Sequence, residues 1–322
     1  MSTNIAKDKL VYNLSKAALA DQKNLHPITA QIYITDYCNN KCPYCTYSRY
    51  MNRNNEYMPL ESFKEYVVIL TGFGVKGIII SGGGEPTLHP EFEAIAEHLE
   101  TNNIPYGINT NFNVFKAIKP NYLKISLDGY DRESYLKARG VDKYDTVIQN
   151  IKEYSLYKHG TKAKTSVGLQ TVVTSAEDVV KFYEAHKGLD VDYYSLRPVE
   201  STQGKYYKEK SEQEVKELKQ ALVELSALDK RICVNYKWNY LDRKFEKCHA
   251  AAFQICVNHK GDVSFCCHKP YEIVGHITDR DILQKKAAYK TDMNMCDIPC
   301  RLTGPCQCIY ELEQDIVNPE FI

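Results

Sequence analysis

The chain has 322 residues, a length that allows one large α/β domain with a smaller appendage. Hydrophobic residues make up 43% and charged residues 25%, which excludes a disordered chain. The chain has 41 basic residues (Lys+Arg) and 41 acidic residues (Asp+Glu), so its formal net charge is zero. This argues against a protein that binds mainly nucleic acid or anionic lipid. No apolar run approaches the roughly 18 residues of a membrane span, and the first ten residues lack the features of a secretion signal. We therefore expect a cytoplasmic protein with no membrane partner.

Cysteine is the unusual residue, with 12 in the chain. Cytosolic thiols are kept reduced, so disulfides are not expected, and clustered cytosolic cysteines more often bind metal or perform redox chemistry. Three cysteines lie at positions 38, 42 and 45, and the other nine lie between 233 and 308. This distribution predicts two separate cysteine sites, one near each end of the chain.

Between these two regions, short β-branched runs alternate with amphipathic stretches whose apolar residues recur at i, i+3 and i+4. The predicted strands are Gln31–Thr35, Gly77–Ser81, Pro105–Asn109, Tyr122–Leu127, Thr165–Val173 and Asp192–Pro198. The predicted helices between them include Leu60–Thr71, Glu91–Asn102, Asp145–Lys158 and Ala176–Lys187. Six such alternations predict parallel strands joined by crossover helices. Because six units are too few for a closed eight-stranded barrel, we expect an α/β fold with an open, partial (β/α)6 barrel.

The pattern changes after Pro198. Residues 201–210 are polar and predict a linker, and residues 211–228 predict a helix that Ser211 and Glu214 begin with a capping box. From residue 231 the chain is rich in cysteine, with short strands and a predicted hairpin tip at 258–262. We divide the chain into a barrel over 1–200, a linker and helix over 201–230, and a small cysteine-rich domain over 231–322.

The first cysteine site lies in the loop directly after the first predicted strand. The thiolates of Cys38, Cys42 and Cys45, within eight residues, can bind three irons of a 4Fe–4S cluster. The fourth iron would then have no protein ligand and would be open to another molecule. A zinc site that takes its fourth ligand from elsewhere is the alternative interpretation.

A glycine run, Gly82-Gly83-Gly84-Glu85-Pro86, directly follows the second predicted strand. Glycines let the backbone approach a ligand closely, and Glu85 can accept a hydrogen bond from an ammonium group. The alternative interpretation of this glycine run is a plain turn or a phosphate-binding loop. A phosphate-binding loop, however, typically contains Lys and Ser or Thr rather than Glu-Pro. The two motifs together are far more specific than either one alone.

On these residues the chain resembles the radical S-adenosylmethionine (SAM) superfamily across roughly residues 30–200. Its CxxxCxxC loop, with Tyr44 before the last cysteine, is similar to that family's cluster loop, and the glycine run resembles its motif for the methionine amino group. Phe112 stands where the family has glycine in a Thr-Asn-Gly segment, and the resemblance gives Arg139 the role of pairing with the SAM carboxylate. The SAM contacts implied by the resemblance are Tyr44, Gly83, Gly84, Glu85, Pro86, Asn109, Asn111, Ser126 and Arg139.

The resemblance also implies an activity. The open iron would bind the amino and carboxylate groups of SAM, and one electron from a flavodoxin- or ferredoxin-type donor would cleave a carbon–sulfur bond. This cleavage yields methionine and a 5′-deoxyadenosyl radical, which takes a hydrogen atom from the substrate. Such chemistry requires a site at the carboxyl ends of the strands that excludes water.

In the second cysteine region, Cys248 is followed by 12 residues, Gly261, four residues and Cys266. This spacing resembles the opening of the SPASM and Twitch extensions, which hold auxiliary iron–sulfur clusters. A hairpin with Gly261 at its tip would bring Cys248, Cys256 and Cys266 together. The later spacings depart from the full SPASM pattern, so one and two auxiliary clusters both stay open, and a structural zinc site is the alternative. The candidate ligands are Cys248, Cys256, Cys266, Cys296, Cys300, Cys306 and Cys308.

Cys267 follows one of these candidate ligands directly. Successive strand side chains point to opposite faces, so a Cys266 that faces a cluster would leave Cys267 facing the substrate or the core. In radical SAM epimerases, which the pair resembles, a cysteine returns a hydrogen atom to the substrate radical. This resemblance gives Cys267 the role of hydrogen-atom donor, with a buried inert cysteine as the alternative.

The sequence leaves the substrate open. Resemblance to SPASM proteins implies a ribosomally made peptide that is crosslinked, epimerised or oxidised, although the 37 residues before Cys38 are too few for a winged-helix peptide-binding domain. A sugar, an aminoglycoside or a nucleotide is the alternative substrate. A non-enzymatic iron–sulfur or zinc scaffold is a separate class of function, which would leave Gly83–Pro86 unexplained.

Overall fold

The computed structural model describes residues 26–45, 47, 54–198, 211–234, 245–246, 248–289, 296 and 300–307. Its strands are β1 (Thr29–Ile32), β2 (Gly77–Ile80), β3 (Tyr106–Thr110), β4 (Tyr122–Ser126), β5 (Ser166–Val172), β6 (Tyr193–Arg197), β7 (Ile232–Val234), β8 (Gln254–Val257), β9 (Asp262–Cys266) and β10 (Lys269–His276). They form one sheet in the order β10-β9-β8-β1-β2-β3-β4-β5-β6-β7. The run from β8 to β7 is parallel, and β9 and β10 are antiparallel additions at the β8 edge.

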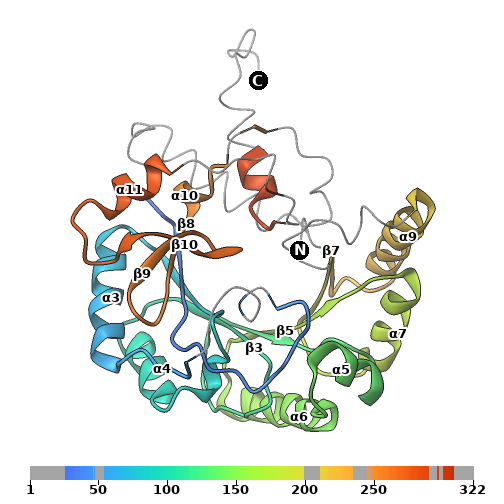
Figure 1. Ribbon diagram of the computed structural model, residues 1–322. Coiled ribbons are helices and arrows are strands. Elements are labelled where there is room, and N and C mark those ends of the chain that lie inside the picture. The colour runs from blue at the N-terminus through green and yellow to red at the C-terminus, as the bar shows by residue number, and fades with distance from the viewer. Residues whose placement is uncertain are drawn as a thin grey trace, which may run out of the picture.

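The helices are α3 (Leu60–Gly72), η2 (Pro86–Leu88), α4 (Phe92–Thr101), α5 (Arg132–Arg139), α6 (Tyr144–Thr161), α7 (Ala176–His186), α9 (Glu212–Leu228), α10 (Ala250–Phe253) and α11 (Ile282–Ala288). The sheet curves into an open barrel whose outer face is covered by α3, α4, α6, α7 and α9 (Figure 1). Apolar residues on these helices, such as Phe63 and Leu99, are buried against the sheet and form the main core. Within the described ranges, no helix combines the length and the apolar character that a membrane span requires.

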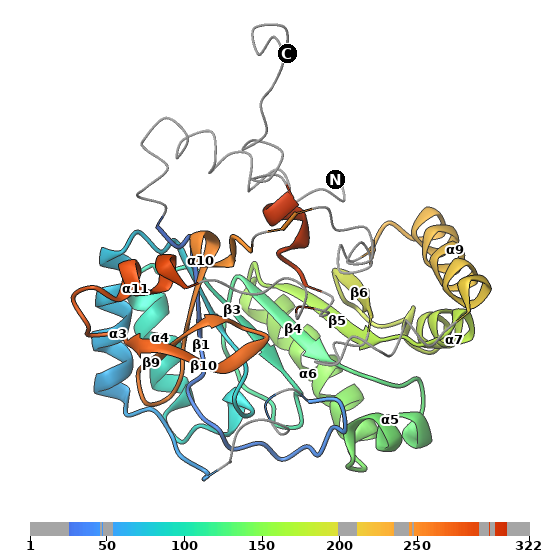
Figure 2. The ribbon, with the colours of Figure 1, turned by 45° about the horizontal axis from the view of Figure 1, so that its top comes forward.

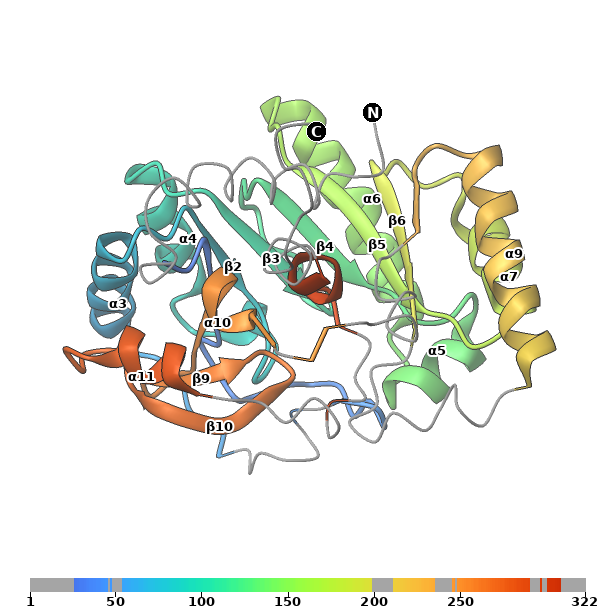
Figure 3. The same ribbon diagram turned by 90° about the horizontal axis from the view of Figure 1, so that it is seen from above.

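The segment 300–307 lies on the inner, open side of the sheet (Figures 1 and 3). The elements β9, β10, α10 and α11 lie at the end of the sheet that carries β8, whereas α7 and α9 lie at the opposite end (Figure 2). The open side of the barrel therefore faces residues from the C-terminal part of the chain.

The predicted strands and crossover helices are present, with ends that differ by three residues or fewer, and the partial barrel is confirmed. The capping box is also confirmed, because Ser211 Oγ accepts from the Glu214 amide at 3.2 Å and the Ser211 amide donates to Glu214 Oε2 at 2.8 Å. The hairpin between β8 and β9 carries Gly261 with a φ of 88°. The predicted linker over 201–210 lies outside the described residues.

The sheet extends further than the six predicted strands. β7 continues it beyond β6, and β8 pairs with β1 in parallel, so the cysteine-rich region adds strands to the barrel sheet. The first strand ends at Ile32, three residues earlier than predicted, because Thr35 has left β1 and bridges to Tyr57.

Two tyrosine rings fill the amino end of the barrel interior. A Cβ atom on Gly107 would lie 2.0 Å from the Tyr122 ring, and one on Gly168 would lie 2.0 Å from the Tyr193 ring. Glycine on one strand thus makes room for an aromatic ring on its neighbour. Side chains two residues apart share a face of a sheet, so Lys124 points into the same interior as Tyr122, nearer the carboxyl end.

Candidate functional site

A cavity of about 290 Å³ lies inside the barrel at the carboxyl ends of the strands. It is lined by the three cysteines of the first site and by every implied SAM contact except Pro86, which begins η2. Residues that are distant in the sequence also line it, among them Cys267, His268 and Arg301. The structure therefore brings the two cysteine regions to one cavity.

The glycine run is held against the cluster loop through the backbone. The amide of Gly84 donates to the Thr35 carbonyl at 2.7 Å, and the amide of Glu85 donates to the Tyr37 carbonyl at 2.6 Å. A Cβ atom on Gly84 would lie 1.9 Å from the Tyr37 carbonyl oxygen. Only glycine allows the backbone to approach this closely. The glycine run and the cluster loop are therefore in direct contact.

Glu85 links the end of β2 to the end of β3, and it is only 3% exposed. Its Oε1 accepts from Thr110 Oγ1 at 2.5 Å and from Thr87 Oγ1 at 2.8 Å, and its Oε2 accepts from the Asn111 amide at 2.6 Å. Burial raises the pKa of the Glu85 carboxyl, and these hydrogen bonds oppose that rise. Glu85 therefore orders the strand ends as well as lining the cavity.

Asn109 and Asn111 both line the cavity from the end of β3. Asn111 Nδ2 donates to Asn39 Oδ1 at 2.7 Å and lies 4.0 Å from Cys38 Sγ, which ties β3 to the cluster loop. Asn109 Nδ2 donates to Ser81 Oγ at 2.9 Å. The Oδ1 atom of Asn109 is buried and has no hydrogen-bond partner among the described residues, which suits an acceptor for a ligand N–H or O–H group.

Phe112 shows how the chain accommodates its departure from the family motif. Its φ of 58° lies in the left-handed region that favours glycine. Its ring is buried and lies 5.9 Å, centroid to centroid, from that of Tyr154. The backbone therefore keeps a glycine-like conformation here, and aromatic packing offsets its strain.

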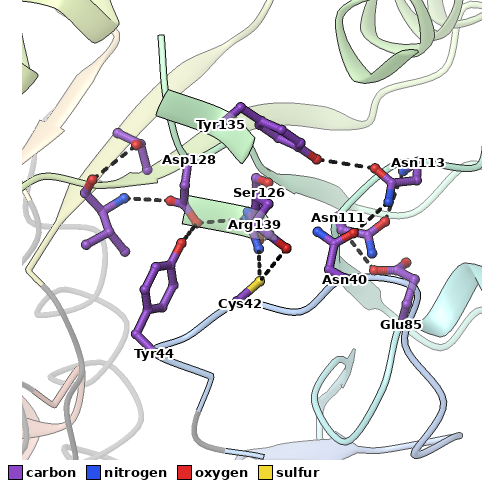
Figure 4. Close-up of polar contacts among 12 residues, drawn as sticks. Asn40, Cys42, Tyr44, Glu85, Asn111, Asn113, Ser126, Asp128, Tyr135 and Arg139 are labelled. Carbon is purple, nitrogen blue, oxygen red and sulfur yellow. Dashed lines mark hydrogen bonds and ion pairs between the residues drawn. The ribbon is translucent and has the colours of Figure 1, made fainter. Parts of the chain in front are cut away.

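Arg139 connects the cluster loop to the end of β4 (Figure 4). Arg139 is only 8% exposed. Its Nη2 atom forms an ion pair with Asp128 Oδ2 at 3.0 Å and also donates to the Ser126 carbonyl. Its Nη1 atom donates to Cys42 Sγ at 3.5 Å. Tyr44 donates to the same Asp128 oxygen at 2.5 Å. The Nε atom of Arg139 is buried without a hydrogen-bond partner in the part of the chain that the structure describes. Nε is therefore the donor that Arg139 retains for a ligand.

We predict that Asp128→Asn destabilises the fold strongly. The substitution would leave Arg139 buried without its counter-charge, a change that typically costs about 3–5 kcal/mol. The matched control is Asp142→Asn, which breaks an exposed pair with Arg132 and should cost less than about 1 kcal/mol. Urea unfolding measures both, and equal effects of the two substitutions would contradict the prediction.

The C-terminal cysteines form two groups that meet at Cys300. Cys256 and Cys266 both interact electrostatically with Cys267, and Cys306 interacts in the same way with Cys248. Cys300 interacts with Cys266 and with Cys306. The remaining candidates are Cys296, which interacts with Lys269, and Cys308, which lies outside the described residues.

These side chains fit an anionic metal cluster. Lys286 is only 1% exposed, and its Nζ atom has no hydrogen-bond partner among the residues that are described. The groups that interact with it electrostatically are the thiols of Cys248, Cys256, Cys266 and Cys267. A buried ammonium requires a nearby anion, which metal-bound thiolates provide. Six gathered cysteines also exceed the four that one zinc ion takes.

Cys267 lies just beyond the strand that ends in Cys266. β9 ends at Cys266, and Cys267 lies in the following turn, so the rule of alternating faces does not apply to this pair. The thiols of Cys266 and Cys267 interact with each other electrostatically. Cys267 also lines the barrel cavity, and its carbonyl accepts from Tyr47 at 3.1 Å. It therefore lies between the two cysteine sites.

Sequence reasoning missed one wall of the cavity. Three cationic side chains, Lys124, Arg197 and Arg301, line it together with Gln31 and Gln170. A lysine inside a predicted buried strand, two residues before Ser126, is a signal that could have found Lys124. No local pattern places Arg301 here, because the segment that carries it arrives from the far end of the chain.

Comparisons with known proteins agree with this geometry. Residues 32–186 match the family model described as the Radical SAM superfamily. A GTP 3′,8-cyclase from Pasteurella multocida is 26% identical over 132 residues, which cover 38% of this chain and 39% of the cyclase. The chain spans less than half of the length of the first curated relatives it matches.

Two solved structures share the fold over most of the chain. Streptococcus suis SuiB bound to precursor peptide SuiA has a TM-score of 0.62 and 17% identity, covering 91% of this chain and 67% of SuiB. Native anSMEcpe with bound AdoMet has a TM-score of 0.64 and 18% identity, covering 87% of this chain and 89% of anSMEcpe. At these identities the likeness shows the fold.

Proposed function

Because this chain belongs to the radical SAM superfamily, we propose that its barrel cavity binds a 4Fe–4S cluster and SAM and abstracts a hydrogen atom from a substrate. The observation that carries the proposal is that the three loop cysteines, the glycine run and Arg139 line one cavity. When bound, the cluster and SAM together supply the 5′-deoxyadenosyl radical, and the protein supplies binding, orientation and the exclusion of water.

Each residue has a task that its surroundings support. Cys38, Cys42 and Cys45 hold the cluster, and the backbone of the glycine run lies beside them. Asn109 Oδ1 accepts a hydrogen bond from SAM, and Arg139 Nε donates one to its carboxylate, because both atoms are buried and lack another partner among the described residues. The other proposed contacts, which line the same cavity, are Tyr44, Gly83, Gly84, Glu85, Asn111 and Ser126.

The direct test is anaerobic reconstitution with iron and sulfide, followed by incubation with SAM and a reductant. A flavodoxin- or ferredoxin-type donor is the proposed physiological reductant. We expect 5′-deoxyadenosine and methionine to form in equal amounts, since one cleavage yields both. A reconstituted protein that binds iron and sulfide but leaves SAM intact would exclude the proposed activity.

The C-terminal cysteines are proposed to hold at least one auxiliary cluster of the SPASM or Twitch type. The grouping of Cys248, Cys300 and Cys306 near Cys266 supports this, as does the buried ammonium of Lys286. One cluster or two would both be compatible with this set of thiols.

We predict that Cys38→Ala/Cys42→Ala/Cys45→Ala retains about four irons and four sulfides or more per chain, because the auxiliary ligands are untouched. Elemental analysis and sulfide determination on the reconstituted variant measure this. The matched control adds Cys248→Ala, Cys300→Ala and Cys306→Ala, and should lose most of the remaining iron. Stoichiometric zinc without sulfide would show that the region is a structural zinc site.

For the substrate we propose a ribosomally made peptide, which the enzyme crosslinks, epimerises or oxidises. Support comes from two proteins of the same fold, SuiB with its precursor peptide SuiA and anSMEcpe with a Cp18Cys peptide. A nucleotide is the second candidate, because the curated relatives that match the barrel include GTP 3′,8-cyclases. A polycationic aminoglycoside is disfavoured by the cationic side chains of Lys124, Arg197 and Arg301 on one wall of the cavity.

A further inference from the structure

A lysine side chain is buried beside the C-terminal cysteines. Lys286 lies in the last turn of α11, which packs on β9 and β10 (Figure 2). It is only 1% exposed, and its Nζ atom has no hydrogen-bond partner among the described residues. The ammonium lies 5.3 Å from the centroid of the Phe265 ring, a contact that attracts the charge but does not neutralise it. Because lysine is almost never fully buried unless its charge is compensated, an anion is expected nearby.

Thiols are the groups that can provide this anion. Those that interact electrostatically with the ammonium are the thiols of Cys248, Cys256, Cys266 and Cys267. Cys256 is influenced by two cations, because Arg301 acts on it as well as Lys286. Arg301 also lines the barrel cavity, whereas Lys286 does not. The charge of Lys286 can therefore be changed without altering a wall of that cavity.

The neighbouring lysine on the same helix has the opposite surroundings. Lys285 is exposed, and its Nζ atom pairs with Asp279 Oδ2 at 2.9 Å and with Asp281 Oδ1 at 3.0 Å. Its charge is thus compensated by carboxylates at the surface. The charge of Lys286 faces cysteines instead, and cysteines become anionic thiolates when they bind a metal. The two lysines therefore form a natural comparison, one paired at the surface and one directed at the metal-binding thiols.

We propose that Lys286 compensates the negative charge of the auxiliary iron–sulfur cluster and thereby raises the reduction potential of that cluster. The proposal rests on the proposed function, which assigns a cluster to these cysteines, and deepens it by naming a residue that controls its potential. Reduction adds one electron to a site that thiolates already make anionic, so a buried positive charge nearby favours the reduced state. The electron comes from the flavodoxin- or ferredoxin-type donor, and Lys286 keeps its proton throughout. Lys286 is thus a positioning residue and not a ligand.

The experiment is a potentiometric titration of the reconstituted full chain, followed by electron paramagnetic resonance. Every protein also carries Cys38→Ala/Cys42→Ala/Cys45→Ala, so that the signal of reduced iron and sulfide comes from the C-terminal cysteines. Lys286→Met removes the charge and keeps an unbranched, flexible side chain. At the midpoint potential of the protein that retains Lys286, we expect this variant to lower the ratio of reduced to oxidised cluster by about tenfold or more. For a one-electron couple this equals a shift of about 59 mV or more to lower potential.

Two further variants distinguish the charge of Lys286 from its packing. Lys286→Arg retains the positive charge, so the ratio of reduced to oxidised cluster should stay within about threefold of its original value. Lys285→Met is the matched control, because it removes an exposed and already paired charge from the same helix, and it should change the ratio by less than about twofold. Iron and sulfide are determined for each protein, so that a changed potential is not confused with a lost cluster.

The proposal is overturned if Lys286→Met keeps its iron and sulfide and an unchanged potential, or if Lys285→Met lowers the potential equally. If Lys286→Met binds no cluster, Lys286→Arg decides between charge and shape. Retention of the cluster by Lys286→Arg supports the proposal, and loss of the cluster from both variants overturns it. A failure of the proposed function is distinct, because the protein that retains Lys286 would then hold no iron–sulfur cluster at the C-terminal cysteines. None of these measurements uses turnover.

Discussion

Replacement of Cys38, Cys42 and Cys45 together by alanine should abolish formation of 5′-deoxyadenosine. These cysteines line the cavity together with the glycine run and Arg139, and Cys267, the other cysteine among the described residues that lines it, belongs to the C-terminal cysteines. Without them, no other thiol on the cluster-loop side can hold iron, and we expect a loss of at least about a thousandfold, equivalent to roughly 4 kcal/mol in the barrier. Chromatography of anaerobic reactions that contain SAM and excess reductant measures the product.

Cys233→Ala is the matched control for this triple variant. Cys233 is a half-buried cysteine on β7 that belongs to neither group of cysteines, so its removal should leave SAM cleavage intact. Melting temperatures of both variants should lie close to that of the wild type, since the three loop cysteines are only partly buried. Cleavage of SAM by the triple variant at the wild-type rate would show that the radical site lies elsewhere.

The sequence predicted the barrel well because its determinants are local. Apolar periodicity within each strand and helix identified the crossovers, and parallel strands end at one edge of a sheet. The cluster loop and the glycine run each directly follow a predicted strand, and the resemblance to the radical SAM superfamily implied that both contribute to one site. The structure adds the cause, since Gly84 lies against the Tyr37 carbonyl with no room for a side chain.

Long-range pairings are what the sequence could not provide. β8 has four residues, and nothing within them indicates that they pair with β1 rather than with another strand. This pairing brings Gln254 near Gln31, and the two amides together hold Arg301. The cationic wall therefore depends on a contact between the two ends of the described chain. A local pattern cannot reveal such a contact, which is why this wall was missed.

The position of Cys267 gives the second large effect we expect. It lines the cavity that the loop cysteines also line, it packs with Cys256, and it interacts electrostatically with Cys266. We propose that it ends the reaction as the hydrogen-atom donor. A C–H bond forms on the substrate radical as the S–H bond of Cys267 breaks, and one electron from the reductant and one proton from solvent restore the thiol.

This role predicts a specific outcome for Cys267→Ala with the peptide substrate in deuterated buffer. Wild-type product should carry one solvent deuterium, because the thiol exchanges its proton with solvent. The variant should still cleave SAM but should accumulate off-pathway species, with deuterated product reduced by about a hundredfold or more, or roughly 3 kcal/mol. Liquid chromatography with mass spectrometry measures both products.

The Cys266→Ala variant, compared with Cys267→Ala, distinguishes whether Cys267 is a hydrogen-atom donor or a cluster ligand. If Cys266 is the ligand and Cys267 the donor, only the Cys266 variant should lose iron and sulfide from the C-terminal site, whereas the Cys267 variant should keep the wild-type content. Loss of iron from both would make Cys267 a ligand, consistent with its interaction with Cys266. Normal product formed at an undiminished rate by Cys267→Ala would leave the thiol a packing role beside Tyr33 and Cys256. The reaction would then be oxidative, with the second electron leaving the substrate radical instead of a hydrogen atom returning to it.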